Sequence, residues 1–220
     1  MKLNFKALAY FVIGVAVVFL LMPFVSYSIY QFFPEIKTAY YLSMITSNTL
    51  FVILIMLIMF KNRLSLNDLG WRRTNFASAL IDVFKICFLV WLINMIYMAF
   101  LYYSGQTTAE NELVKLLQDP TISMFIANIF LIAVIVPFIE ETLFRGVLLG
   151  CLRNYFGKWT AIVISACIFS ALHFDLTGFI PKLVLGIGLG FLYTKHDSIY
   201  PAIGLHALNN LLAVIGVSVS

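Results

Sequence analysis

The sequence predicts an all-α protein, a polytopic bundle of transmembrane helices. Of the 220 residues, 62% are hydrophobic and only 11% are charged, whereas a soluble domain carries about 45–50% apolar and about 25% charged residues. Apolar stretches near the roughly 20 residues that a spanning helix needs recur along the whole chain. Most charges fall between these stretches rather than within them. We therefore expect membrane helices joined by polar connections.

Seven apolar segments are expected to form these helices. The first three are long enough to span a bilayer, the fourth is longer than the hydrocarbon core requires, and the fifth and sixth are short. Short helices are tolerated at membrane depth where they line a cavity. The segments are 7–31, 39–60, 77–103, 121–150, 159–174, 179–195 and 199–218.

The first segment follows Lys2 and Lys6 and so resembles a signal peptide. Its apolar run is longer than the usual 7–15 residues of a signal core, so we interpret it as a membrane helix. No repeat or linker divides the chain. We expect one membrane domain over residues 1–220, with N-terminal helices and a basic loop over 1–120 and a catalytic core over 121–218.

Basic residues gather in alternate connections. Because Lys and Arg are enriched in cytoplasmic loops of membrane proteins, we expect the N-terminus and the richer connections to be cytoplasmic. The net charge of +4 comes without a dense basic stretch, so no nucleic-acid partner is predicted. The richer set is Lys2, Lys6, Lys61, Arg63, Arg72, Arg73, Arg145, Arg153, Lys158 and Lys195, and the other connections hold Lys37, Lys115 and Lys182 beside Glu35, Glu110, Glu112, Asp119 and Asp175.

The connection over residues 61–75 is polar, basic and rich in turn residues. We expect it to lie along the cytoplasmic surface, with interfacial anchors at Leu64, Leu66, Leu69 and Trp71.

Within the third segment, Lys85 follows Asp82 by three residues. A local ion pair, or snorkelling of the lysine toward the helix end, would explain both charges.

Two adjacent carboxylates lie within the fourth segment. A charge at the bilayer centre costs roughly 2.5–3.5 kcal/mol, so Glu140 and Glu141 are expected to be paired, to face water, or to take part in chemistry. Neighbouring residues of a helix point about 100° apart. Glu141 stands four residues before Arg145, which is the favoured order for an ion pair. This pairing leaves Glu140 as the carboxylate available for general-base catalysis.

Other polar residues can reach the depth of Glu140. His173 and Glu140 lie 16 and 17 residues on either side of Gly157, so two helices joined there would return to the same level within about 1.5 Å. His206 lies roughly 10–12 Å into its segment from the same side, and Asn210 shares its helix face. A histidine in a membrane helix is more often a packing residue, but the matched depth favours a site in the cytoplasmic half of the membrane.

These residues follow the motifs of a known family. The motifs read EETLFR from Glu140 to Arg145, FSALH from Phe169 to His173, and HALNN from His206 to Asn210. In this order they resemble the CPBP intramembrane proteases (CAAX proteases and bacteriocin-processing proteins, also called Abi), in particular bacterial members related to type II CAAX prenyl endopeptidases. The resemblance covers about residues 120–218. The stretch LSLNDLGWR, residues 64–72, also resembles the loop that precedes this core.

The resemblance implies about seven to eight membrane helices around a conical catalytic cavity. It implies that Glu140 and His173 activate a water molecule that attacks the scissile carbonyl. It further implies that His206 and Asn210 donate hydrogen bonds to the oxyanion, a role worth about 2.7–4 kcal/mol per donor in other enzymes.

The resemblance also implies supporting roles for three residues. Glu141 and Arg145 would hold their helix in position, and Phe169 would pack beside His173 or line the substrate groove. The family was long described as metal-dependent, so zinc held by Glu140, His173 and His206 stays open. The sequence has no HExxH motif, and we favour a metal-free mechanism without a cofactor.

The run from Gly186 to Gly190 is spaced like part of a dinucleotide-binding fingerprint. It lies inside a predicted membrane helix and lacks the strand–turn–helix context of such sites. Close helix packing through small residues is the better interpretation.

The leading hypothesis is a membrane-bound hydrolase, an endopeptidase that cleaves a membrane-associated or lipidated peptide or protein near the cytoplasmic face. Two other classes stay open: a non-catalytic scaffold or bacteriocin self-immunity protein that binds a partner, and a small transporter that uses Glu140 as a proton relay. The internal repeat of many transporters is not visible. Alanine at Glu140 or His173 would abolish proteolysis but leave a scaffold functional.

Overall fold

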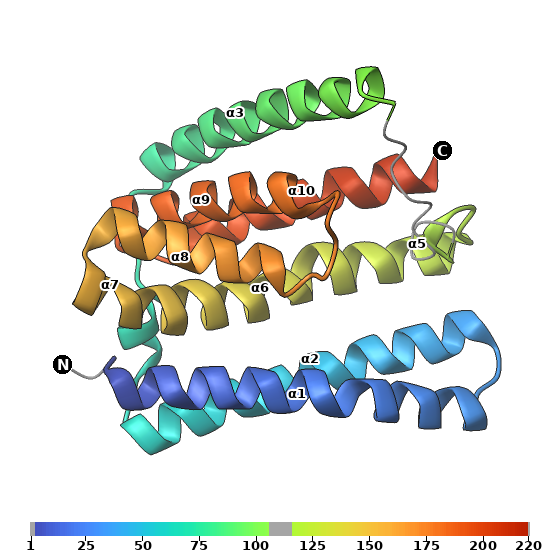
Figure 1. The fold of residues 1–220 in the computed structure, drawn as a ribbon, viewed down its shortest axis with the longest axis horizontal. Coiled ribbons are helices and arrows are strands. Elements are labelled where there is room, and N and C mark those ends of the chain that lie inside the picture. Colours follow the sequence, from blue (N-terminus) through green and yellow to red (C-terminus); the bar gives the residue numbers. More distant parts are fainter. Residues whose placement is uncertain (1–2, 106–115, 220) are drawn as a thin grey trace.

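The computed structural model describes residues 3–105 and 116–219. These described residues form helices joined by short connections, without a strand among them (Figure 1). The predicted all-α membrane bundle is confirmed. Within the described residues, five helices are long and apolar enough to cross a membrane: Phe5–Phe32, Ile36–Asn62, Phe76–Tyr103, Ile122–Phe156 and Tyr200–Ser218.

Helices α1 (Phe5–Phe32) and α2 (Ile36–Asn62) form an antiparallel hairpin (Figure 1). Each begins at a polar cap, where the side chain of Asn4 or Glu35 accepts a hydrogen bond from a backbone N–H of the first turn. Such caps satisfy donors that have no partner within the helix. The predicted segments 7–31 and 39–60 therefore match the observed helices to within three residues at each end.

The short 3₁₀ helix η1 (Leu66–Leu69) leads into α3 (Phe76–Tyr103). The prediction of interfacial anchors in this loop is wrong for three of the four residues. Leu64 and Leu69 are 8% and 0% exposed, and the Trp71 ring packs against the protein. The 3₁₀ turn folds the loop back onto the bundle, so these side chains contact protein, and only Leu66 points outward.

The fourth segment is one continuous helix from residue 122 to residue 156, which is longer than predicted. It contains two stretches with the wider π-helical turn, which is frequent at functional sites. Its parts are α5 (Ile122–Asn128), η2 (Ile129–Ile135), α6 (Val136–Glu141), η3 (Thr142–Leu149) and α7 (Gly150–Phe156). The chain reverses at Gly157, whose φ of 74° suits glycine.

Three further helices follow: α8 (Lys158–Ala171), α9 (Phe179–His196) and α10 (Tyr200–Ser218). Helix α8 ends before the predicted residue 174, since the backbone at Phe174 has a φ of 51°, which no helix continues.

Helices α8 and α9 pack very closely. A Cβ atom added at Gly186 would lie 3.0 Å from the Cβ of Ala166, and one at Gly190 would lie 3.1 Å from Ile162. This confirms the predicted packing through small residues.

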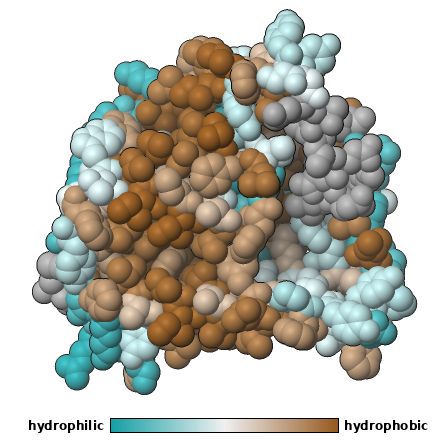
Figure 2. All heavy atoms as spheres, viewed as in Figure 1, coloured by the Kyte–Doolittle hydropathy of each residue, from teal (hydrophilic) through white to brown (hydrophobic). Residues whose placement is uncertain are grey.

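The helices form a layered bundle with its polar connections at two ends (Figure 1). The α1–α2 hairpin lies on one side, α3 lies on the other against α9 and α10, and the remaining helices lie between them. Figure 2 shows hydrophobic residues over the middle of one face and hydrophilic residues toward its left-hand and right-hand edges. This pattern is typical of a protein surrounded by lipid.

The basic connections lie together at the end that holds the start of α1, which we call the basic end; the other end is called the far end (Figure 1). Four of the charges used to predict the topology, Lys2, Glu110, Glu112 and Lys115, lie outside the described residues. Arg145 does not belong to a connection, because it is 0% exposed inside the bundle.

The predicted local pair in α3 is also replaced by another arrangement. Asp82 contacts Lys195 at 2.7 Å and His196 at 2.9 Å, both at the end of α9. Lys85 is exposed, in agreement with the alternative that it extends away from the helix core. The acid therefore joins α3 to α9 rather than stabilising α3 alone.

Candidate active site

Glu141 lies at the end of α6 with its side chain fully buried. Its two oxygens face Arg145, whose Nη1 donates at 3.2 Å to Oε1 and whose Nε lies 3.1 Å from Oε2. Arg145 Nη2 donates at 3.2 Å to the carbonyl of Gly186 in α9. The pair therefore lies together as its spacing predicts, and it also fastens the long helix to α9.

Phe169 of α8 lies at the centre of the polar residues. The Arg145 guanidinium lies 4.6 Å from its ring centroid, and the centroids of Phe144, His173 and His206 lie 5.1, 4.8 and 5.9 Å away. Phe169 is 1% exposed. Its ring therefore separates the two histidines and fixes their relative placement.

His206 of α10 is buried against both carboxylates. Its Nδ1 lies 2.7 Å from Oε1 of Glu141, and its Nε2 lies 3.8 Å from Oε2 of Glu140. Because a carboxylate in the ionised form only accepts hydrogen bonds, Nδ1 carries the proton in this contact. The contact of Glu141 with His206 was not predicted, since residues 65 positions apart give no signal in a single sequence.

Glu140 differs from its neighbour in its surroundings. Its side chain is 25% exposed, and its Oε2 is a buried oxygen without a hydrogen-bond partner among the described residues. Buried polar atoms are nearly always hydrogen-bonded, so an exception calls for an explanation in function or in a missing water molecule. Oε2 of Glu141 also accepts no hydrogen bond among the described residues, but it lies 3.1 Å from Nε of Arg145 in an ion pair, whereas Oε2 of Glu140 lies 3.8 Å from Nε2 of His206. Glu140 is therefore the carboxylate with more free acceptor capacity.

His173 follows the end of α8 and is exposed. Its Nδ1 lies 2.8 Å from the carbonyl of Phe169. Because a carbonyl oxygen can only accept, the proton is on Nδ1 and the lone pair of Nε2 is free to take a proton. The structure connects His173 to His206 through the ring of Phe169 rather than by direct contact.

Asn210 lies one turn after His206 in α10. Its Nδ2 donates at 3.0 Å to the carbonyl of Ile132 in η2, and its Oδ1 accepts from Asn209 at 3.3 Å. One N–H of the amide is thus left for another acceptor. The π-helical η2 supplies the carbonyl that orients Asn210.

The zinc alternative does not fit this geometry. Among residues 3–105 and 116–219, no three His, Cys, Asp or Glu side chains come together as a group that could hold a metal ion. The hydrogen bonds of the two histidines do not decide the question, because Nδ1 of His173 faces a carbonyl and Nδ1 of His206 faces a carboxylate, which leaves Nε2 of each ring as the atom that could bind another group. We therefore derive no step that involves a metal.

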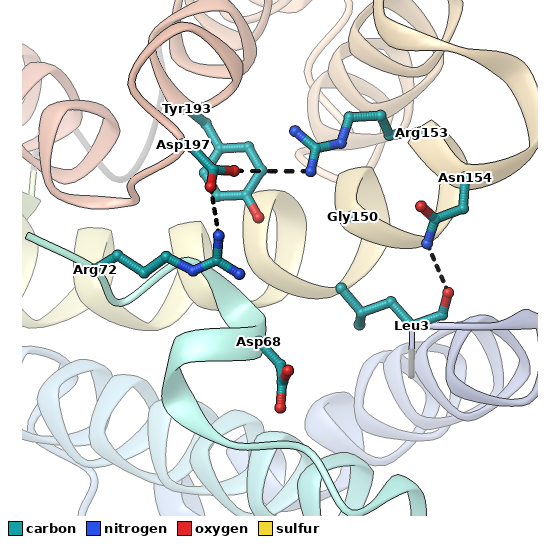
Figure 3. A pocket seen from close by; sticks show the side chains of 8 residues that line it. All are labelled: Leu3, Asp68, Arg72, Gly150, Arg153, Asn154, Tyr193 and Asp197. Atoms are coloured by element: carbon teal, nitrogen blue, oxygen red, sulfur yellow. Dashed lines mark hydrogen bonds and ion pairs between the residues drawn. The ribbon is translucent and has the colours of Figure 1, made fainter. Parts of the chain in front are cut away.

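A separate polar pocket opens at the basic end, close to η1 (Figure 3). None of the predicted site residues lines it. Its walls come from the start of α1, from η1 and the residues after it, from α7 and from the end of α9: Leu3, Asp68, Arg72, Gly150, Arg153, Asn154, Tyr193 and Asp197.

Comparisons with known proteins agree with the motifs. Residues 122–212 match the family described as type II CAAX prenyl endopeptidase Rce1-like. The chain is 28% identical over 114 residues to the "Putative membrane peptidase YdiL" of Bacillus subtilis, which covers 52% of this chain and 46% of that protein. It is 31% identical over 86 residues to the "UPF0177 protein YxdF" of Lactococcus lactis, which covers 37% of this chain and 45% of that protein.

The chain thus spans less than half of the length of these curated relatives. No solved structure gives a significant match. The matched family region contains every predicted catalytic residue, from Glu140 to Asn210. The family model that matches residues 122–212, type II CAAX prenyl endopeptidase Rce1-like, thus agrees with the resemblance that the three motifs carry.

Proposed function

We propose that the protein is an intramembrane endopeptidase that hydrolyses a peptide bond in a membrane-associated or lipidated peptide or protein. Glu140 and His173 bind a water molecule and take its proton as its oxygen attacks the scissile carbonyl. The free acceptor capacity of Glu140 and the free Nε2 of His173 suit this role. Protonated Glu140 or His173 then gives the proton to the leaving amine.

In this proposal His206 and Asn210 stabilise the oxyanion. Since Nδ1 of His206 is held by Glu141, Nε2 donates only when the ring is a doubly protonated imidazolium. Glu141 is then a positioning residue that aims His206, besides its contact with Arg145.

The single observation that carries the proposal is the state of Glu140. Within the described part of the chain, its Oε2 accepts no hydrogen bond and lies 3.8 Å from Nε2 of the buried His206, whereas Oε2 of Glu141 is paired with Arg145. A structural pair alone needs only Glu141 and Arg145, and it does not explain why a second carboxylate, Glu140, stands directly before Glu141 inside the membrane.

We also propose that the N-terminus and the basic end are cytoplasmic. The described basic end carries, among others, Lys6, Arg72, Arg153 and Lys195. His206 lies about 9 Å along α10 from Tyr200 at 1.5 Å per residue. This supports the predicted depth, with the catalytic groups in the cytoplasmic half.

The test compares membrane and released peptides by mass spectrometry in strains that express the parent chain, Glu140→Ala or His173→Ala. A matched control is Glu35→Ala, which removes an exposed carboxylate at the start of α2. We expect one or more uncleaved peptides to accumulate at least tenfold with both site variants and not with the control. Equal amounts of each variant in the membrane fraction show that the fold is kept.

Normal processing by both site variants would contradict the proposal. If these variants also retain the biological activity of the parent, such as immunity, the protein acts by binding a partner. If the parent chain and His173→Ala carry out proton-coupled uptake and Glu140→Ala does not, the protein is a transporter.

A further inference from the structure

The polar pocket at the basic end lies apart from the candidate active site and has no part in the proposed catalysis. Its volume is about 390 Å³, which falls within the range of small-molecule sites, about 300–1,000 Å³. Four parts of the chain meet around it: the start of α1, η1 with the residues after it, α7, and the end of α9 (Figure 3). A ligand bound there would therefore contact segments that are far apart in the sequence.

Two arginines face one carboxylate in this pocket. Arg72, in the loop after η1, forms an ion pair with Asp197 at the end of α9, and Nη2 of Arg153 in α7 lies 3.8 Å from the other oxygen of that carboxylate (Figure 3). All three side chains are partly exposed. Two guanidinium groups and one carboxylate leave one positive charge in excess, so this part of the pocket attracts an anion.

The arginines also keep N–H groups that a ligand can use. A guanidinium group has five N–H donors. At Arg72, Nε donates to the carbonyl of Asn67 at 2.8 Å and Nη1 contacts Asp197. Arg153 donates no hydrogen bond within residues 3–105 and 116–219. Because arginine binds the oxygens of a phosphate in pairs, a phosphate group between the two side chains would use these donors.

Tyr193 of α9 adds an uncharged donor on the inner wall of the pocket. The residue is 3% exposed, and its hydroxyl has no hydrogen-bond partner in the part of the chain that the structure describes. Figure 3 shows this hydroxyl pointing into the pocket, where the charges of Arg153, Asp197 and Arg72 act on it. Buried polar groups are nearly always hydrogen-bonded, so the Tyr193 hydroxyl calls for a partner in the pocket.

The second carboxylate of the pocket belongs to the fold of η1. Oδ2 of Asp68 accepts hydrogen bonds from the N–H and the hydroxyl of Ser65, each at 2.7 Å. This capping box fixes the start of η1. In Figure 3, Asp68 lies apart from the place where Arg72 and Arg153 meet Asp197. The side of the pocket that suits an anion is therefore the one where the two arginines meet.

The turn beside the pocket carries residues typical of a membrane interface. Tyr155 and Trp159, on either side of Gly157, are 50% and 60% exposed, and Tyr and Trp are enriched where a membrane meets water. Nζ of Lys158 lies 5.4 Å from the centroid of the Trp159 ring. Arg153 stands two residues before Tyr155, so the pocket is expected at the level of the lipid headgroups, where basic pockets bind anionic lipids.

We propose that this pocket binds a phosphate group, carried by the headgroup of an anionic phospholipid in the adjoining leaflet. Arg72 and Arg153 bind the phosphate oxygens, and the hydroxyl of Tyr193 donates a further hydrogen bond. Asp197 orients the two arginines and competes with the phosphate for them. The site goes beyond the proposed function and does not depend on catalysis, so Glu140→Ala should bind the lipid as the parent chain does.

The test counts the ligands bound to each chain by native mass spectrometry. The protein, purified in a neutral detergent, is titrated with phosphatidylglycerol, with phosphatidylcholine or with inorganic phosphate. The variants are Arg153→Gln, Tyr193→Phe and Asp197→Asn, the last because asparagine tolerates the left-handed backbone of Asp197. The matched control is Arg73→Gln, which removes the same charge from an exposed residue that does not line the pocket.

We expect one phosphatidylglycerol per chain, bound more tightly than phosphatidylcholine, whose choline cation the arginines repel. Arg153→Gln should weaken its binding at least about tenfold and Tyr193→Phe about threefold, the losses typical of a charged and of a neutral hydrogen bond. Asp197→Asn should tighten binding about twofold to fivefold, because the competing exposed ion pair is lost. A pocket that was only distorted by the substitution would not bind its ligand more tightly. Arg73→Gln should leave the affinity unchanged.

Equal losses in Arg153→Gln and Arg73→Gln would overturn the proposal, because charge anywhere at the basic end would then hold the lipid. Unchanged affinity in both Arg153→Gln and Tyr193→Phe, or a parent chain that binds neither phosphatidylglycerol nor phosphate, would overturn it as well. Inorganic phosphate bound at least as tightly as phosphatidylglycerol would support the phosphate site and assign it to a soluble ligand instead of a lipid.

Discussion

The two sides of the candidate site show how one membrane bundle serves stability and chemistry in different places. On the basic side, Glu141 and Arg145 are fully buried and form an ion pair with 3.1 Å between Nε and Oε2. On the far side, Asp175 and Lys182 form the same kind of pair but remain partly exposed. A buried pair depends on both partners, because loss of either leaves an unpaired charge. When one partner of an exposed pair is lost, water solvates the remaining charge, so the loss costs little stability.

The largest expected effect is that of Arg145→Ala. It leaves Glu141 buried without its counter-charge and should lower the free energy of unfolding by about 3–5 kcal/mol. Thermal unfolding in detergent and the yield in the membrane fraction measure it. The matched control is Arg72→Ala, which removes an ion pair whose side chains are 45% and 59% exposed and should cost about 0–1 kcal/mol. Equal stability of the two variants would contradict the expectation that the buried pair contributes more to stability than the exposed one.

A smaller effect is expected from Leu69→Ala. Leu69 is 0% exposed beneath the site, and truncation of a buried leucine costs about 2–5 kcal/mol. Leu176→Ala is the matched control on the far side, where 92% exposure predicts a change within about 0.5 kcal/mol. The same unfolding assay compares them. A larger loss from Leu176→Ala would mean that the α8–α9 connection is packed against something at the far end.

The smallest effect in this series is that of Gly146→Ala. Its Cβ would meet the Leu69 carbonyl oxygen at 2.9 Å, and this backbone atom must shift, at a cost of about 1–3 kcal/mol. Gly204→Ala in α10 is the control, because its Cβ would have Val83 as its nearest neighbour at 3.9 Å. We expect a lower unfolding temperature only for Gly146→Ala. An unchanged value there would show that η1 rests loosely on η3.

Much of the fold could be predicted from the sequence because hydropathy acts over whole segments. The seven segments, the reversal at Gly157 and the Glu141–Arg145 pair depend on local spacing, which a single chain displays. The partners of Asp82 could not be predicted in this way, since Lys195 and His196 come from a helix far along the chain.

The candidate site was predicted as a set of residues but not as a network. An α-helical spacing says nothing of the π-helical turns in η2 and η3, which change the rotation of each following side chain. It also does not reveal that Phe169 separates the two histidines or that Glu141 holds His206. The catalytic roles of Glu140, His173, His206 and Asn210 stay predictions, with Glu140→Ala and His173→Ala as their test.

The contact of Leu69 with Gly146 has a consequence for how such chains evolve. Gly146 lies within the family match of residues 122–212, whereas Leu69 lies outside it. The matched segment therefore packs against a residue outside the match and is not expected to fold when expressed alone. Among relatives, the two positions should change in concert, with a bulkier residue at one compensated by a smaller one at the other.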